Sequence, residues 1–149
     1  MLAGLNALPD LAADTIVAVH DAARPCFPCA ALDALFARAD AHPVGAIWAQ
    51  PMLDTVKRAN QAGEVAQTLD RTVLWRAQTP QVFRFAALRE AMALAQAEGA
   101  VITDESQAME RCGLFAAIVP CPVENPKLTR AGDLPQLLHF LSSSQTPAA

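Results

Sequence analysis

Thr15-Ile-Val-Ala-Val-His-Asp-Ala-Ala-Arg-Pro25 is the stretch around which the rest of this chain is organised. Residues 15–19 are apolar or β-branched, which predicts a short strand buried on both faces. The strand ends at His20, and Asp21 and Arg24 follow it, three residues apart. In open α/β sheets, ligands bind beyond the carboxyl ends of strands. The sequence therefore places a candidate site at Asp21 and Arg24.

The chemistry of these two side chains suggests phosphate binding. Arginine offers a planar fork of donors that matches phosphate, and aspartate is a hard oxygen ligand that suits Mg²⁺. A surface Asp–Arg pair that merely closes a loop explains the same two residues. Without further motifs, this simpler interpretation is the favoured one.

Apolar patterns along the rest of the chain predict alternating helices and strands, typical of an α/β fold. The helix between the strands 15–19 and 44–49 predicts a right-handed βαβ unit in which these two strands pair in parallel. Residue 103 or 104 is expected to cap a helix, and we favour capping over catalysis for Asp104-Glu105. Helices are expected at 2–8, 29–40, 85–99 and 133–142, strands at 44–49 and 115–119, a short strand and turn at 74–83, and a flexible tail at 142–149.

Residues 54–71 differ from their surroundings because they are polar and lack a continuous apolar face. A turn near 60–63 predicts a hairpin that projects from the body. An isolated two-stranded hairpin is marginally stable in water, so this one is expected to pack on something such as a second subunit. A solvated loop is the alternative that the composition leaves open.

Composition and charge exclude several classes of protein. The 149 residues fit one domain, the net charge is −4, and no apolar run approaches the length of a membrane helix. We therefore expect a cytoplasmic protein that binds neither nucleic acid nor membrane. Cys26 and Cys29 have the spacing of a metal or redox pair, but no histidine lies near them, so reduced thiols are favoured over a zinc site.

Six motifs occur together in a fixed order. They are His20-Asp-Ala-Ala-Arg-Pro25, Asp54-Thr-Val-Lys57, Asp70-Arg71, Gln78-Thr-Pro-Gln-Val-Phe83, Thr103-Asp-Glu105 and Asn125-Pro-Lys-Leu-Thr129. In this order and spacing the chain resembles the 2-C-methyl-D-erythritol 4-phosphate cytidylyltransferases over residues 2–141. The resemblance implies a Rossmann-like nucleotidyltransferase sheet flanked by helices, with a projecting β-hairpin arm.

The resemblance also implies a reaction. Members of this family transfer CMP from CTP to 2-C-methyl-D-erythritol 4-phosphate in non-mevalonate isoprenoid biosynthesis, with Mg²⁺ and release of pyrophosphate. By resemblance, Asp21 lies near the metal and, with Arg24, Thr55 and Thr79, binds the substrate. Arg71 and Lys127 match the pair that positions the substrate phosphate for attack. The arm at 54–71 would join a homodimer and carry Thr55 and Arg71 into the partner's site.

The chain departs from the family pattern at its beginning. No segment matches the family's first strand and Gly-rich loop, whose basic residues bind the CTP triphosphate, so the resemblance implies a partial domain over 1–141 with a sheet incomplete at its N-terminus. We therefore expect little transferase activity, and a tendency to aggregate, from these 149 residues alone. Cys121-Pro122, Pro126 and Arg130 also differ from the usual residues, which affects how Lys127 is set.

Two other functions remain open at the level of sequence. A cytidylyltransferase for another polyol phosphate, such as ribitol 5-phosphate, shares much of the Asp21–Arg24 motif and of the 78–83 turn. A non-catalytic dimerisation module would explain the unmatched Gly-rich loop, although the retention of Arg71 and Lys127 disfavours it.

Overall fold

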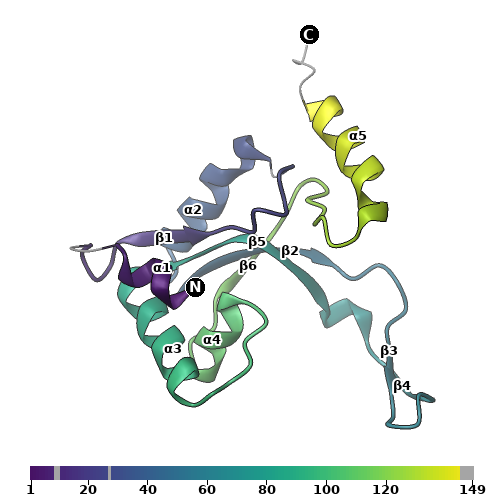
Figure 1. Cartoon of the computed structure of the whole chain (residues 1–149), viewed down its shortest axis with the longest axis horizontal. Coiled ribbons are helices and arrows are strands. Elements are labelled where there is room, and N and C mark those ends of the chain that lie inside the picture. The colour runs from purple at the N-terminus through teal and green to yellow at the C-terminus, as the bar shows by residue number, and fades with distance from the viewer. Residues whose placement is uncertain (9–10, 27, 145–149) are drawn as a thin grey trace.

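A four-stranded mixed sheet forms the centre of the body in the computed structural model, which describes residues 1–8, 11–26 and 28–144 (Figure 1). The strands are β1 (Ile16–Val19), β2 (Gly45–Pro51), β5 (Trp75–Arg84) and β6 (Ala117–Pro120), in the order β1-β5-β2-β6. Strand β5 is antiparallel to both β1 and β2, whereas β6 is parallel to β2. The predicted α/β class is confirmed.

The predicted pairing of β1 with β2 is wrong, because β5 lies between them. Gln81 in the middle of β5 is opposite Val19 of β1 on one side and Ile47 of β2 on the other. Strands β1 and β2 therefore run in the same direction without touching. Strand β5, which follows the arm in sequence, lies next to β1, where the βαβ pattern had predicted β2.

Strand β5 is also longer than the predicted short strand and turn. It has ten residues and contains Pro80, a residue that cannot donate to a ladder. The ladder with β2 shifts register between Ile47 and Ala49, opposite this proline. The irregularity accommodates Pro80 where a regular ladder would require an N–H group.

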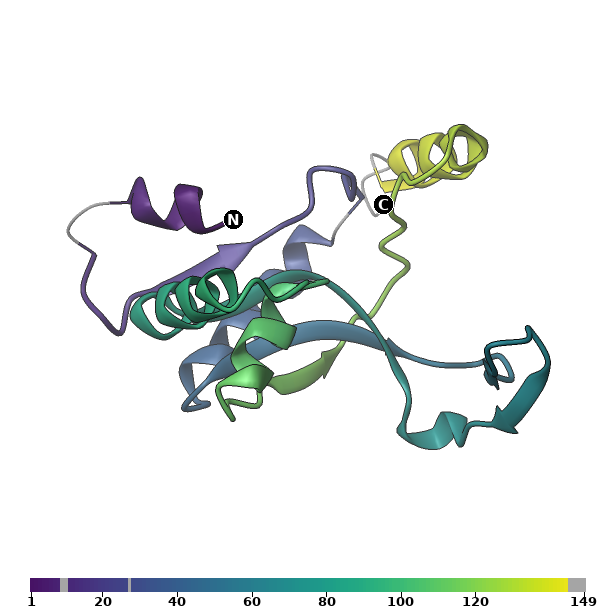
Figure 2. The ribbon, with the colours of Figure 1, turned by 60° about the horizontal axis from the view of Figure 1, so that its bottom comes forward.

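Helices cover the two faces of the sheet (Figure 2). One core cluster contains Ile47 and Phe83 with α1 (Leu2–Asn6), α3 (Phe85–Ala97) and α4 (Glu105–Arg111). The other contains Trp48 and Val82 with α2 (Leu32–Asp40), which follows a 3-10 turn at Cys29–Ala31. Neighbouring residues of β2 and β5 thus point to opposite faces, as the two-residue repeat of a strand requires.

The two outer strands are less buried than the sequence predicted. Ala18 of β1 is exposed, and Ile118 of β6 is 44% exposed. Both strands lie at an edge of the sheet, where the helices cover them incompletely. Phe36, expected in the apolar stripe of α2, is exposed as well.

Gly45 begins β2 at a place where no other residue fits. Its φ angle is +141°, and a Cβ atom there would lie 2.1 Å from the carbonyl oxygen of Val82. Glycine therefore permits the close approach of β2 to β5.

The segment predicted as a hairpin forms a separate two-stranded sheet, β3 (Lys57–Ala59) and β4 (Val65–Thr68). It extends away from the body, as Figure 2 shows, and both strands are exposed throughout. A 3-10 turn at Arg71–Val73 leads from it back to β5. We refer to residues 54–71 as the arm.

Helix α5 (Leu134–Ser144) follows a 3-10 turn at Ala131–Asp133 and lies apart from the sheet, at the end of the loop that follows β6 (Figure 1). It continues through residues 142–144, which the sequence had assigned to a flexible tail. Residues 145–149 of that tail lie outside the described part of the chain. Among the described residues, no helix has the length and apolar character needed to cross a membrane.

Candidate functional site

Asp21 is the centre of a charged cluster beyond the carboxyl ends of β1 and β6. Lys127 Nζ lies 2.8 Å from Asp21 Oδ2, and Arg24 Nε lies 3.4 Å from the same oxygen. Asp21 and Lys127 are partly exposed, whereas Arg24 is largely covered. Lys127 is thus brought together with Asp21 and Arg24, two predicted site residues that precede it by more than a hundred positions.

These contacts change the acidity of the carboxyl group. The hydrogen bond from Lys127 lowers the pKa of Asp21, and the Lys127 charge and the bond from Arg24 act in the same direction. Partial burial opposes them, but the net pKa is lowered. The carboxylate therefore stays charged between two cations that an incoming phosphate would also attract.

Thr79 fixes the loop that carries Asp21. Its Oγ1 atom accepts the backbone N–H of Asp21 at 3.1 Å and lies 3.0 Å from His20 Nδ1. His20 Nε2 in turn lies 2.9 Å from the carbonyl oxygen of Arg24. Because a carbonyl oxygen only accepts, Nε2 is the donor in this contact, and Nδ1 is the ring atom that contacts the Thr79 hydroxyl.

The Thr79 hydroxyl therefore makes its contacts within the protein. Thr79 is buried, and its hydroxyl already contacts the Asp21 N–H and His20 Nδ1. His20 was quoted in the sequence motif without a role, and the structure gives it one: it links the two ends of the Asp21–Arg24 loop.

The segment that carries Lys127 is attached to the sheet at several points. The Cys121 N–H donates to the Ala49 carbonyl at 3.0 Å, and the Leu128 N–H donates to the Ala23 carbonyl at 2.8 Å. Between them, the buried Asn125 donates from Nδ2 to the Thr79 carbonyl at 2.7 Å. The carbonyl oxygen of Asn125 accepts from Arg24 Nη1 at 2.6 Å.

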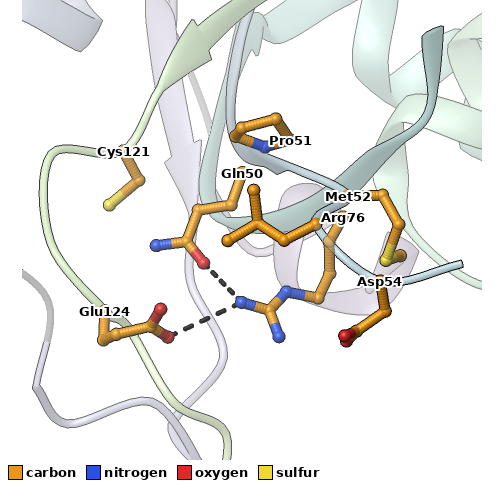
Figure 3. Close-up of a pocket in the computed structure, with 8 residues that line it drawn as sticks. Gln50, Pro51, Met52, Asp54, Arg76, Cys121 and Glu124 are labelled. Carbon is orange, nitrogen blue, oxygen red and sulfur yellow. Dashed lines mark hydrogen bonds and ion pairs between the residues drawn. The ribbon is translucent and has the colours of Figure 1, made fainter. Parts of the chain in front are cut away.

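A polar cluster at the base of the arm supports the same segment (Figure 3). Arg76 binds Gln50 and lies 3.5 Å from Glu124, and Gln50 Nε2 donates to the Val123 carbonyl at 3.0 Å. These groups line a cavity of about 340 Å³ that also includes Met52, Asp54 and Cys121. Sequence reasoning missed this cluster, because its members come from three distant segments and match no motif.

Asp104 serves the structure of α4, as predicted. Asp104 Oδ1 accepts the Gln107 N–H at 2.9 Å and so caps the helix. Asp104 Oδ2 accepts from the buried Gln81 at 2.9 Å, which joins α4 to β5. Burial first, and then the charges of Asp104 and Asp21, raise the pKa of Glu105.

The Asp21 carboxylate fits a magnesium ion that is held partly by substrate phosphates. Mg²⁺ commonly takes one or two protein carboxylates and completes its shell with substrate phosphates and water. Asp21 supplies one carboxylate, and the described ranges contain no group of three or more His, Cys, Asp or Glu placed to hold a metal. A metal here would therefore depend on a bound phosphate.

All four cysteines are free, and Cys26 donates to the Leu137 carbonyl across a 3.7 Å contact. Burial raises the pKa of the Cys26 and Cys121 thiols. Cys29 is exposed.

The family model for 2-C-methyl-D-erythritol 4-phosphate cytidylyltransferase matches residues 1–142. The chain belongs to this family. It is 47% identical over 135 residues to the 2-C-methyl-D-erythritol 4-phosphate cytidylyltransferase of Xylella fastidiosa, and covers 58% of that protein. It is 43% identical over 145 residues to that of Shewanella amazonensis, and covers 60% of it. These matches include 90% and 97% of this chain.

Solved structures give the same result for the fold. The crystal structure of the Francisella tularensis 2-C-methyl-D-erythritol 4-phosphate cytidylyltransferase superimposes with a TM-score of 0.84 at 32% identity. That match covers 93% of this chain and 65% of the Francisella protein. The chain thus spans about three-fifths of the curated relatives that it matches.

The remaining two predicted residues of this cytidylyltransferase family member lie on the arm. Thr55 and Arg71 are exposed, and Arg71 Nη1 donates to the Leu53 carbonyl. The contacts of the described residues do not bring either side chain to Asp21 or Lys127 of the same chain. The body thus assembles Asp21, Arg24, Thr79 and Lys127, while Thr55 and Arg71 stay apart.

Proposed function

We propose that this chain forms the sugar-phosphate side of an active site that transfers CMP from CTP to 2-C-methyl-D-erythritol 4-phosphate. The observation that carries the proposal is the meeting of Arg24 and Lys127 on Asp21, in a chain that belongs to this family. In the reaction, a phosphate oxygen of the methylerythritol phosphate bonds to the α-phosphorus of CTP. The bond to the leaving pyrophosphate breaks, so the products are CDP-methylerythritol and pyrophosphate.

This chemistry needs charge neutralisation and alignment more than a protein nucleophile. Lys127 is a point charge with three donors and suits a phosphate oxygen, and Arg24 adds a second positive charge within the same cluster. Asp21 holds Lys127 in place before the substrate binds. Arg71 would complete the cationic site when the arm of a second copy supplies it.

Asp21 would also hold Mg²⁺ together with the phosphates. The ion would neutralise phosphate charge during transfer. In the free protein, Asp21 Oδ2 is shared by Lys127 and Arg24. Binding of a phosphate would draw both cations towards it and leave the carboxylate available to the metal.

We further propose a homodimer in which each arm reaches the partner's site. The support is the exposure of apolar side chains on and beside the arm: Val65 is 67% exposed and Val73 is 71% exposed. A hairpin this exposed gains little stability from its own chain. Mixing an Arg71→Ala chain with a Lys127→Ala chain tests the proposal, because mixed dimers carry one complete site and should recover binding of methylerythritol phosphate. Mixed samples no better than the two variants alone would contradict it.

Calorimetric titration with 2-C-methyl-D-erythritol 4-phosphate tests the proposed function directly. Charge-assisted hydrogen bonds contribute about 1.5–3 kcal/mol, so Lys127→Ala should weaken binding at least about 10-fold. Arg89→Ala is the control, because it removes one positive charge from α3, where Arg89 stacks on Phe85. Equal affinity in both variants, or no binding by the wild-type chain, would overturn the proposal. Ribitol 5-phosphate in the same titration measures how far the site selects its polyol.

A further inference from the structure

Asn125 occupies a junction between the two cation-bearing segments of the site. Its side chain is fully buried, and Nδ2 donates to the Thr79 carbonyl on β5 at 2.7 Å. Its own carbonyl oxygen accepts from Arg24 Nη1 at 2.6 Å. One residue thus contacts the central strand through its side chain and the Arg24 guanidinium through its backbone.

The hydrogen bonding of the Asn125 amide is incomplete. The atom that faces the Thr79 carbonyl must be the nitrogen, because a carbonyl only accepts. Oδ1 is then buried without a hydrogen-bond partner among the described residues. A half-satisfied buried amide is a poor choice for stability, since an apolar side chain of similar size avoids the desolvation cost. Something other than stability accounts for an amide at this position.

The covalent structure connects Asn125 rigidly to Lys127. Pro126 lies between them, and its ring fixes φ and restricts the residue before it. On the far side of Lys127, the Leu128 N–H donates to the Ala23 carbonyl at 2.8 Å. Lys127 therefore lies between two hydrogen-bonded residues, Asn125 and Leu128. Few freely rotating backbone dihedrals separate it from Asn125.

We propose that Asn125 is a positioning residue. It fixes the positions of the Lys127 ammonium and the Arg24 guanidinium, which would bind a substrate phosphate. The inference rests on the proposed function, because it takes these two cations as the phosphate site. Asn125 itself touches no substrate. It acts by holding the Lys127 segment to β5 and by fixing the Arg24 guanidinium through a backbone carbonyl.

Amide hydrogen exchange and phosphate binding, measured on Asn125→Asp and Asn125→Ala, test the proposal. Both changes remove the N–H donor to the Thr79 carbonyl, one with an added carboxylate and one without. We expect protection of the Leu128 amide to fall at least about 10-fold, and affinity for methylerythritol phosphate to fall by a similar factor. The Cys121 amide, which precedes the junction and donates to Ala49, should keep its protection.

Gln78→Ala is the matched control. Gln78 is also a buried amide on β5, lines the same cavity as Asn125 and Lys127, and has an Oε1 atom without a hydrogen-bond partner. Its side chain donates to neither segment, so its loss should leave protection of the Leu128 amide nearly unchanged, and this protection is the readout on which the control is compared. An equal loss of Leu128 protection in Gln78→Ala and in the Asn125 variants would show that disturbance of the cavity is enough, which overturns the proposal.

The two readouts separate this inference from the proposed function. If the wild-type chain binds no methylerythritol phosphate, the proposed function fails, and exchange at Leu128 still decides whether Asn125 holds the segment. Unchanged Leu128 protection in both variants would overturn the positioning role. Loss of protection over the whole sheet in both variants would also overturn it, since Asn125 would then serve general stability.

Discussion

The body and the arm hold their candidate site residues in opposite ways. In the body, Arg24 and Lys127 both contact Asp21, and buried groups of the same chain fix the loops that carry them. On the arm, Thr55 and Arg71 are exposed and flank two short strands that are exposed throughout. A single chain therefore completes the body's half of the site, whereas the arm's half requires another surface to define its position.

The difference follows from what lies beneath each region. The body has two apolar clusters, one on each face of the sheet, and buried polar groups such as Gln81 and Asn125 join its elements. The arm has backbone pairing and short-range hydrogen bonds, such as Lys57 to Thr68 and Asn60 to Glu64. Substitutions in the two regions should therefore have very different consequences.

The largest effect is expected for Trp48→Ala in the body. Trp48 is 0% exposed and packs between α2 and the sheet, so its truncation should cost about 3–5 kcal/mol of unfolding free energy. Urea denaturation followed by circular dichroism measures this loss. A cost below about 1 kcal/mol would mean that the body is not organised by this cluster.

Asp104→Ala should have a smaller but clear effect. It removes the cap on the Gln107 N–H and leaves the buried Gln81 without its acceptor. A lost cap costs about 1–2 kcal/mol, which the same denaturation experiment resolves. Asp33→Ala is the control, because this exposed residue in the first turn of α2 provides no side-chain cap. Equal losses of unfolding free energy in the two variants would show that neither the cap nor the link between Gln81 and α4 stabilises the fold.

Glu105→Gln should make the body less sensitive to pH. Burial and the charges of Asp104 and Asp21 raise the pKa of Glu105 in the folded state, so its carboxylate is disfavoured there relative to the unfolded chain. Its contribution is therefore favourable at low pH and is lost as the pH rises from the unfolded pKa through the folded one. The variant should gain stability relative to wild type at neutral pH and not at acidic pH. Denaturation at several pH values would contradict this if the difference were constant.

The smallest effect on folding is expected for Val65→Ala on the arm. Val65 is exposed, so its truncation should change the unfolding free energy by no more than about 0.5 kcal/mol. If the arm packs on a second copy, the same variant should weaken association in sedimentation experiments. A large loss of folding stability without any change in association would remove the contrast between body and arm.

The sequence predicted the helices and strands better than it predicted which strands pair with each other. The apolar periods located α3 and the strands β1 and β2, and the cap at Asp104 followed from its residue type. The parallel pairing of β1 with β2 was wrong because β5, thirty residues later, pairs with both. Local patterns report which face of an element is apolar, but the choice of partner depends on strands that are far away in sequence.

The candidate site shows the same division. The sequence by itself determined that Asp21 and Arg24 follow a strand, and it predicted a hairpin at residues 54–71 with a solvated loop as the alternative, because residue type and periodicity are local properties. Only the tertiary structure placed Lys127 Nζ 2.8 Å from Asp21, enclosed the Thr79 hydroxyl and put Asn125 at the junction of two segments. Those contacts join residues from different strands and loops, and burial and hydrogen bonding decide them only when the whole sheet is assembled.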